Sequence, residues 1–462
     1  MLERRTKIVA TLGPATDAEG VLDALVAAGL DCARLNCSHG TPDDLRRRAA
    51  AVREASARAG RPVGLLFDLQ GPKLRLAAGI EERALAAGEE VVFGPGGVPV
   101  DFPAFARLVT PRSEIVIGDG VPRLSVVAVD GEDVRARALS PGPLLPRKGI
   151  NVTYARPELP AITPKDVADL ALAAELGGDY VALSFVRTAD DMRRLRGALR
   201  EHGSQARVIA KVEKVEAYEN LDEIIAASDG VMVARGDYGV EAGVARVPLM
   251  QKDTIARATQ AGRVVITATQ MLESMIQAPE PTRAEVADIA NAVIDGTSAV
   301  MLSAETSVGA YPVQAVAAMA SIAQAAEEAP EIHGRCRKTR HDSAAEAVMH
   351  TAVELADELD AVALIVPTET GGAARACAKY RVPRPIVALA HSQRTSHQLT
   401  LEWGVYPTTM PSTESVDDLI ETALVTAAEY AGLERGARVV LTAGRRTATP
   451  GATNLIMVRV IP

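Results

Sequence analysis

Short apolar runs alternate with amphipathic stretches along the first two thirds of the chain. Seven segments have the spacing of amphipathic helices: 19–28, 42–59, 163–176, 189–201, 215–227, 249–260 and 283–294. Eight apolar runs have the composition of buried parallel strands: 7–12, 31–35, 64–67, 180–183, 208–210, 231–233, 264–267 and 299–302. Eight strands that alternate with helices predict an α/β fold, a (β/α)8 TIM barrel formed by residues 1–69 and 157–330.

The segment 70–156 interrupts this alternation after the third predicted strand. It is rich in Gly, Pro and Val, and Gly-Asp-Gly and Asp-Gly turn signals separate its alternating runs. This pattern is typical of a small β-barrel or sandwich. Because the segment leaves from a loop that follows a barrel strand, we expect a lid over the barrel mouth. A passive decoration of the barrel is the alternative.

The pattern changes again near residue 331. A helix is predicted at 344–359, followed by a strand at 363–366, a Gly/Thr turn at 368–372 leading into another helix, a strand at 386–389, and a closing pair at 439–442 and 455–460. The segment 331–462 therefore reads as a separate α/β domain. A Gly-rich turn before a helix can hold a phosphate on backbone N–H groups, but such turns are common in α/β domains.

Chemically capable side chains follow most of the predicted barrel strands. In chain order they include Arg34, Asn36, Ser38, His39, Asp68, Ser184, Arg187, Lys211, Glu213, Arg235, Asp237, Thr269, Gln270, Ser303 and Glu305. Active sites of TIM barrels lie at the C-terminal ends of the strands, where the βα loops converge. The distribution of these residues favours a catalytic barrel.

Two carboxylates in this set, Glu213 and Asp237, belong to one predicted β-α-β unit. Parallel pairing of its two strands would bring both to the same edge of the sheet. With Lys211 and Arg235 beside them, they would suit Mg²⁺, which takes one or two carboxylates and completes its shell with water and substrate oxygens. A surface ion-pair cluster is the alternative, and the spacing alone does not decide between them.

The composition limits the class of protein. The 462 residues are 48% hydrophobic and 24% charged, with a formal net charge of −9, which predicts an ordinary soluble protein and argues against a general nucleic-acid binder. No apolar run approaches the length of a membrane span and no signal peptide is evident, so a cytoplasmic protein with no membrane partner is expected. Four cysteines, Cys32, Cys37, Cys336 and Cys377, lack metal spacing and read as reduced thiols.

Eight segments resemble the pyruvate kinase family over nearly the whole chain. They are TKIVATLGPAT (6–16), ARLNCSHG (33–40), FDLQGPKLR (67–75), KVE (211–213), VMVARGDYGVE (231–241), TATQMLESM (267–275), PTRAEVADIANAV (281–293) and MLSAETSVGAYP (301–312). The resemblance implies transfer of the phosphoryl group of phosphoenolpyruvate to ADP, giving ATP and pyruvate, with Mg²⁺ or Mn²⁺ as cofactor. No Walker A sequence is present, which excludes a P-loop NTPase.

The resemblance also implies roles for individual residues. Glu213 and Asp237 would hold the metal, Lys211 would face the phosphoryl group, and Arg34 would hold the phosphate. Backbone N–H groups of Gly236 and Asp237 would receive the substrate carboxylate. Thr269, with Ser303 and Glu305, matches the positions that protonate the enolate. The nucleotide would contact Pro14, Asn36, His39, Arg75 and Lys165.

One departure from the family concerns a monovalent cation. Many members hold K⁺ with residues that match Asn36, Ser38 and Asp68 and with the hydroxyl of a threonine where this chain has Leu69. Lys73 stands where K⁺-dependent members carry glutamate, and its ammonium could replace the ion. We therefore expect that K⁺ is not required.

The family also suggests regulation and assembly. The turn 368–375 resembles an effector loop, and a site for a phosphorylated allosteric effector could remain around Thr368, Thr370 and Arg375, although a plain turn is an equal alternative. A homotetramer is expected from the family alone. Two other functions stay open: a different Mg²⁺-dependent barrel enzyme of phosphoenolpyruvate or pyruvate, such as an aldolase or lyase, and a non-catalytic regulatory protein on the same fold.

Overall fold

The computed structural model of the chain describes residues 4–102, 104–118, 120–153, 160–332, 343–444 and 453–462. Its central domain is a closed parallel barrel with the strand order β1-β16-β15-β14-β13-β12-β3-β2. The strands are β1 (Lys7–Thr11), β2 (Cys32–Asn36), β3 (Gly64–Asp68), β12 (Tyr180–Leu183), β13 (Arg207–Val212), β14 (Gly230–Ala234), β15 (Val264–Ala268) and β16 (Ala299–Leu302). All eight predicted strands are present, and the predicted TIM barrel is confirmed.

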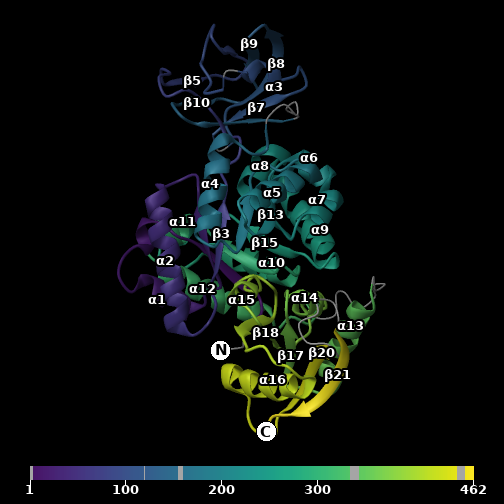
Figure 1. Cartoon of the computed structure of the whole chain (residues 1–462). Helices are drawn as coiled ribbons and strands as arrows, with labels where there is room; N and C mark the ends of the chain where they lie inside the picture. The colour runs from purple at the N-terminus through teal and green to yellow at the C-terminus, as the bar shows by residue number, and fades with distance from the viewer. Residues whose placement is uncertain (1–3, 103, 119, 154–159, 333–342, 445–452) are drawn as a thin grey trace.

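Helices surround the barrel (Figure 1). They include α1 (Val21–Ala28), α2 (Pro42–Ala59), α4 (Pro164–Glu175), α5 (Ala189–Glu201), α9 (Val247–Gln260), α10 (Arg283–Ile294) and α12 (Pro312–Ala326). Capping explains the sharp starts of several of them. Thr282, for example, precedes α10 and accepts the N–H of Glu285.

Several helical features differ from the prediction. The segment 215–227 forms two helices, α6 (Val215–Glu219) and α7 (Leu221–Ala227), because Asn220 leaves the helical conformation and its side chain donates to the carbonyl of Arg187 at 3.0 Å. The α8 helix (Arg235–Ala242) begins directly after β14 and lies outside the predicted helical segments. The α12 helix was not predicted, since alanines on both of its faces weaken the amphipathic contrast.

The inserted segment is a separate β domain at one end of the barrel (Figure 1). Six strands form an antiparallel sheet with the order β4-β11-β7-β8-β9-β6, and a second pair is β10-β5. The sheet has its own apolar core, which includes Phe93, Phe105 and Leu124. The strands are β4 (Leu74–Arg75), β5 (Arg83–Leu85), β6 (Glu90–Phe93), β7 (Glu114–Ile117), β8 (Arg123–Asp130), β9 (Asp133–Ala138), β10 (Gly142–Leu144) and β11 (Gly149–Val152), with a short helix α3 (Phe105–Leu108). The domain is a small antiparallel half-barrel.

The C-terminal segment is an α/β domain at the opposite end of the barrel (Figure 1). Its five-stranded sheet has the order β19-β18-β17-β20-β21, in which only the β20–β21 pair is antiparallel. The strands are β17 (Ala363–Thr368), β18 (Ile386–Ala390), β19 (Val405–Thr409), β20 (Arg438–Gly444) and β21 (Thr453–Val460), and the helices are α13 (Ala344–Glu358), α14 (Gly372–Ala378), α15 (Gln393–His397) and α16 (Val416–Ala431). The separate α/β domain is confirmed.

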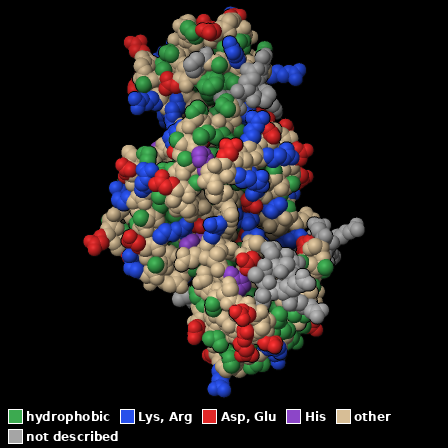
Figure 2. All heavy atoms as spheres, in the orientation of Figure 1, with side chains coloured by type: hydrophobic (Ala, Val, Ile, Leu, Met, Phe, Trp, Pro, Cys, Tyr) green, Lys and Arg blue, Asp and Glu red, His purple; other side chains and the backbone are tan. Residues whose placement is uncertain are grey.

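The barrel and the C-terminal domain pack against each other directly. Trp403, which is 1% exposed, belongs to the apolar core of the barrel although it lies in the C-terminal segment. A Cβ atom at Gly64 would lie 2.4 Å from the Oγ1 of Thr400, so this close approach requires glycine. Figure 2 shows Lys, Arg and His side chains along this junction.

The proposed domain limits, 1–69 with 157–330, 70–156 and 331–462, stay predictions, since parts of the boundaries lie outside the described residues. Cys336 lies there too, while Cys32, Cys37 and Cys377 are buried free thiols. In the part of the chain that the structure describes, no helix has the length and apolar character required to cross a membrane.

Candidate active site at the carboxyl ends of the barrel strands

Lys211 lies at the centre of a buried charged cluster near the end of β13. Its Nζ is 2.9 Å from Oε1 of Glu213 and 3.2 Å from Oδ1 of Asp68, and it donates to Oγ of Ser184 at 2.7 Å. Asp68 also accepts from Nε of Arg34 at 2.7 Å. The closed barrel thus brings the ends of β2, β3, β12 and β13 to one place.

The charged groups in this cluster shift one another's pKa values. Burial would lower the pKa of Lys211, but the carboxylates of Asp68 and Glu213 raise it above its ordinary value. Burial would likewise raise the pKa of Asp68, but Lys211 and Arg34 lower it. Lys211 is therefore a permanent cation at neutral pH, held in a fixed position in a site that excludes bulk water.

The two candidate metal ligands lie at the same end of the barrel. Lys211 pairs with Met232 in the parallel register, so Glu213 and Asp237 both follow neighbouring strands at the carboxyl edge. Burial raises the pKa of Glu213, Lys211 opposes this effect, and the like charge of Asp237 raises the pKa further. Glu213 and Asp237 thus act on each other as like charges at this edge of the barrel, and their sharing of one cation stays a prediction.

The donor set fits a hard divalent cation. Among the described residues, no group of three or more His, Cys, Asp or Glu side chains could hold a metal by itself. Two carboxylates leave most of the coordination shell to water and substrate oxygens, which is the arrangement that Mg²⁺ commonly adopts. Oε2 of Glu213 is oriented by the N–H of Phe185 at 2.8 Å. Phe185 itself has a φ of 56°, an uncommon left-handed backbone for a bulky residue.

Thr269 is held in a strained conformation beside the start of α8. Its φ is 71°, and the next residue, Gln270, has a φ of 54°. A β-branched residue rarely adopts this region, so the surrounding contacts must maintain it. The hydroxyl of Thr269 donates to the carbonyl of Ala268 at 2.6 Å and accepts the N–H of Gly236 at 2.9 Å. Thr269 therefore lies next to the N–H group that we expect to receive a substrate carboxylate.

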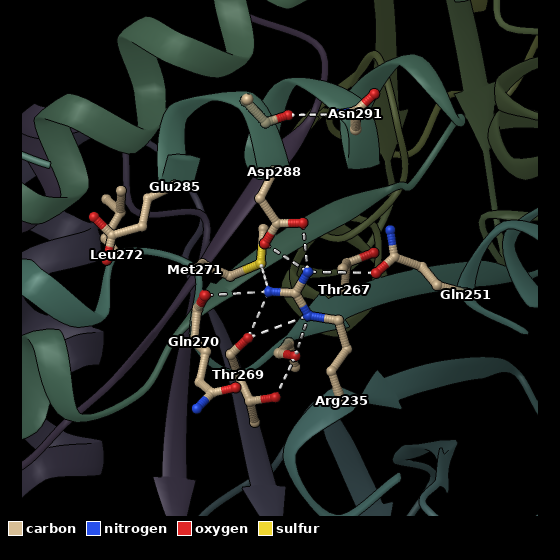
Figure 3. Close-up of polar contacts among 12 residues, drawn as sticks. Arg235, Gln251, Thr267, Thr269, Gln270, Met271, Leu272, Glu285, Asp288 and Asn291 are labelled. Atoms are coloured by element: carbon tan, nitrogen blue, oxygen red, sulfur yellow. Dashed lines mark hydrogen bonds and ion pairs between the residues drawn. The ribbon is translucent and has the colours of Figure 1, made fainter. Parts of the chain in front are cut away.

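Arg235 maintains this conformation, a role that the sequence analysis did not assign (Figure 3). Its Nη2 donates to the carbonyls of Thr269 at 2.6 Å and Gln270 at 3.3 Å, and its Nε lies 3.2 Å from the carbonyl of Thr269. Its Nη1 pairs with Asp288 of α10 at 2.6 Å. The position of Arg235 directly after a strand was a signal for function, but its partners are set by the tertiary structure alone.

Glu305 and Ser303 lie on the adjacent βα loop. Oε1 of Glu305 accepts the N–H of Leu272 at 3.1 Å, and Oε2 accepts the N–H of Ser303 at 2.6 Å. Glu305 is 1% exposed. Through these two hydrogen bonds it connects the loop after β15 to the loop after β16. This contact supports the loop that carries Thr269; a proton relay through Glu305 stays a prediction.

The predicted nucleotide residues come from the turn after β1, from the end of β2 and the loop that follows it, from β4 of the inserted domain and from α4. Lys165 donates to the carbonyl of Cys37 at 2.6 Å, which joins α4 to the loop of Asn36 and His39. Burial and the charges of Lys73, Arg75 and Arg34 lower the pKa of His39. These cationic groups therefore gather on one side of the site. Pro14 begins a short 3-10 helix after β1 and is exposed.

The residues of the predicted former K⁺ site have partners of their own. The side chain of Asn36 accepts the N–H of Ser38 at 3.0 Å, and Leu69 is 1% exposed. Asp68 contacts both Arg34 and Lys211. Lys73 is exposed, and its charge acts on His39.

The predicted effector loop lies in the C-terminal domain, away from this site. Arg375 folds back over it and donates to the carbonyl of Thr370 at 2.8 Å. Burial lowers the pKa of Arg375 to about 10, and Arg207 of the barrel contributes to this shift. Thr368 ends β17 and is 6% exposed.

The fold and these side chains define an enzyme of the (β/α)8-barrel class with its charged groups gathered at the carboxyl ends of the strands. The family model described as "Pyruvate kinase, barrel domain" matches residues 3–316, and "Pyruvate kinase, alpha/beta domain" matches residues 346–459. The chain belongs to the pyruvate kinase family of phosphotransferases.

Curated relatives agree with this assignment. A pyruvate kinase of Geobacillus stearothermophilus is 40% identical over 479 residues, which cover 100% of this chain and 81% of the relative. A pyruvate kinase of Mycobacterium tuberculosis is 41% identical over 471 residues, covering 99% of this chain and 98% of the relative. A pyruvate kinase of Clostridium acetobutylicum is 38% identical over 476 residues, covering 99% of this chain and 100% of the relative.

Proposed function

We propose that this protein catalyses the Mg²⁺-dependent transfer of the phosphoryl group of phosphoenolpyruvate to ADP, giving ATP and pyruvate. The observation that carries the proposal is the buried position of Lys211 between Asp68 and Glu213, with Asp237 acting on Glu213. Phosphoryl transfer requires mainly positioning and neutralisation of spreading negative charge. A fixed cation beside two carboxylates meets that requirement.

The side chains have distinct roles in this proposal. Glu213 and Asp237 would hold Mg²⁺ (or Mn²⁺), which neutralises negative charge on the transferring group when bound. Lys211 donates to the phosphoryl oxygens, and Arg34 holds the phosphate. The N–H groups of Gly236 and Asp237, in the first turn of α8, receive the substrate carboxylate in place of the Thr269 hydroxyl.

The second half of the reaction adds a proton to the enolate carbon. Thr269 is the nearest candidate to the carboxylate site, because its hydroxyl already bonds Gly236. A threonine hydroxyl is a weak acid, so an ordered water must supply the proton through it. Ser303 and Glu305 position the loop and complete the path.

On the nucleotide side, Pro14, Asn36, His39, Arg75 and Lys165 bind ADP, and a second Mg²⁺ accompanies the nucleotide. Activity does not require K⁺. Two observations support this: Leu69 has no side-chain oxygen, and Asp68 already contacts two cationic side chains. Lys73 adds a further fixed charge nearby.

The protein acts in the cytoplasm as a homotetramer, in the last step of glycolysis, as its family membership suggests. A phosphorylated effector binds the loop of Thr368, Thr370 and Arg375, which begins a helix. The β half-barrel closes over the barrel mouth as a lid during turnover.

A steady-state assay tests the proposal. Pyruvate should form from phosphoenolpyruvate only when ADP and Mg²⁺ are both present, with one ATP formed per pyruvate. An aldolase or lyase of the same fold would act on its substrate without ADP. Pyruvate formation that does not depend on ADP would reject the proposal.

A further inference from the structure

Thr11 is the last residue of β1 and is 4% exposed. It lies two residues after Val9, which belongs to an apolar cluster of strand residues inside the barrel. Side chains two positions apart on a strand point to the same face, so Thr11 also faces the barrel interior. The sequence analysis assigned no role to this residue.

The same two-residue step places charged groups of the candidate site around Thr11. In the parallel register of β1 and β2, Thr11 pairs directly with Arg34. The Thr11 hydroxyl thus belongs to the layer of side chains that closes the barrel interior at the carboxyl ends of the strands. Three charged residues of this layer follow members of the apolar cluster by two positions: Arg34 after Cys32, Asp68 after Leu66 and Lys211 after Ile209.

The hydroxyl of Thr11 is held in one orientation. It lies 2.9 Å from Nη1 of Arg34 and 2.9 Å from the carbonyl oxygen of Leu302, the last residue of β16. An arginine can only donate and a carbonyl can only accept, so the hydroxyl proton goes to Leu302 and a lone pair faces Arg34. The backbone of Thr11 is fixed as well, since its carbonyl accepts from the hydroxyl of Thr306 at 2.9 Å. Thr11 is therefore a preformed acceptor for the guanidinium.

Two acceptors together fix the guanidinium of Arg34. Nε donates to Oδ2 of Asp68 at 2.7 Å, and Nη1 donates to the hydroxyl of Thr11. Contacts at two different nitrogens set both the position and the rotation of this planar group. Nη2 donates to no group in the part of the chain that the structure describes. It is the nitrogen that Arg34 presents to an anionic ligand.

Without Thr11, Asp68 would be a competitor for this nitrogen. A guanidinium beside a carboxylate prefers two parallel hydrogen bonds. Arg34 forms only one of them here, because its Nη1 is engaged by Thr11 and Oδ1 of Asp68 faces Lys211 at 3.2 Å. If Arg34 rotated to contact Asp68 through a second nitrogen, it would withdraw a donor from the ligand.

We propose that Thr11 is a positioning residue of the active site, whose hydroxyl holds the guanidinium of Arg34 so that Nη2 faces the phosphate of phosphoenolpyruvate. This inference rests on the proposed function. It adds a residue that acts on the substrate only through Arg34.

Steady-state kinetics of Thr11→Val test the inference, because valine has nearly the shape of threonine but no hydroxyl. The value of kcat/KM for phosphoenolpyruvate should fall by about tenfold or more, the usual effect of losing a hydrogen bond to a charged group. The inhibition constant of pyruvate, which carries no phosphate, should change by less than about twofold. Thr11→Ser restores the hydroxyl and should return kcat/KM to within about threefold of the wild type.

Thr259→Val is the matched control. Thr259 is 5% exposed, and its hydroxyl donates to the carbonyl of Gly296 at 3.3 Å, at the opposite end of the barrel. This variant loses the same group without a contact to Arg34, so kcat/KM should stay within about twofold of the wild type. Thermal unfolding shows whether each variant is folded. If Thr11→Val is not, Thr11→Cys provides the same comparison, since a thiol is a weak acceptor.

Three results would overturn the inference. Equal kinetics of the Thr11→Val and Thr259→Val proteins would show that Arg34 does not need the hydroxyl. A Thr11→Ser protein as impaired as Thr11→Val would show that the hydroxyl is not the group that matters. Equal losses for phosphoenolpyruvate and pyruvate would mean that Thr11 supports the whole site rather than Arg34. Failure of the proposed function would be visible separately, because the wild-type protein would then show no ADP-dependent formation of pyruvate.

Discussion

Arg235 and Asp288 form an ion pair, with Nη1 2.6 Å from Oδ2, that joins the first residue of α8 to α10. On the other side of the guanidinium, Nη2 donates hydrogen bonds to the carbonyls of Thr269 and Gln270 (Figure 3). Both of these residues have left-handed backbones. The conformation next to the candidate substrate carboxylate site thus depends on a side chain that itself carries out no chemical step.

Arg235→Lys should lower kcat/KM by about tenfold to a hundredfold, because small displacements of a positioned group carry costs of this size. A lysine ammonium cannot reproduce the planar fork that contacts two carbonyls and a carboxylate. Steady-state kinetics of Arg235→Lys and of Asp288→Asn, which keeps a hydrogen-bond acceptor, provide the comparison. We expect the smaller loss in Asp288→Asn; unchanged kinetics in Arg235→Lys would show that Thr269 does not need this support.

Lys211→Met should lower kcat by about a hundredfold or more, by analogy with the loss of one transition-state donor. The long apolar side chain fills the same space but cannot neutralise the phosphoryl group. Rapid-quench measurement of ATP formation checks this. Turnover close to that of the wild type would refute the role of Lys211.

Thr269→Ala should slow the exchange of pyruvate methyl protons with solvent by about a hundredfold, since the variant removes the proposed proton path. The exchange is followed by NMR in deuterated buffer and is independent of phosphoryl transfer. Exchange at the wild-type rate would mean that another group delivers the proton.

Replacing K⁺ by tetramethylammonium should change kcat by no more than about twofold, because fixed ammonium and guanidinium groups supply the positive charge. The measurement is a steady-state assay at constant ionic strength. A loss of nearly all activity in tetramethylammonium would contradict the expectation. The Lys73→Glu variant, assayed in both salts, tests whether Lys73 carries the effect.

Lys7 should make stability depend on pH in the alkaline range. Lys7 donates to the carbonyl of Val405 at 2.6 Å and faces the ring of Tyr406, and burial lowers its pKa from 10.5 to about 8. Asp31 and Glu327 raise this pKa, whereas Arg4 and Arg61 lower it. Above pH 8 the folded protein loses this proton while the unfolded chain keeps it, so the free energy of unfolding rises with pH.

Lys7→Met should lack this increase. The difference in unfolding free energy between wild type and Lys7→Met should rise by on the order of 3 kcal/mol between pH 8 and 10.5. Urea denaturation at both pH values measures it, with the surface variant Lys252→Met as a control. Parallel pH curves for wild type and Lys7→Met would contradict the assignment.

Local signals explain why much of the fold was predictable. The α2 helix has Thr41 with Asp44 as a capping box at its start and a left-handed Gly60 at its end, so both limits are encoded within a few residues. The α6–α7 break was missed because it depends on the contact of Asn220 with Arg187, which lies on another loop. The same distinction holds for the candidate site. Lys211 and Glu213 could be predicted as site residues because they follow a strand directly. The function of Arg235 depends on its contacts with Thr269 and Asp288, which are distant in the sequence.

By itself, the sequence determined the alternation of strands and helices, the inserted β segment, the C-terminal α/β segment and the residues that follow each strand. These features depend on residues that are close together in the sequence, so the periodicity of hydrophobic residues is enough to predict them. The tertiary structure decided that Lys211 lies between Asp68 and Glu213, that Arg235 supports a left-handed Thr269, and that Trp403 packs into the core of the barrel. Closure of the barrel and packing of the domains set these distances, and no local pattern in the chain encodes them.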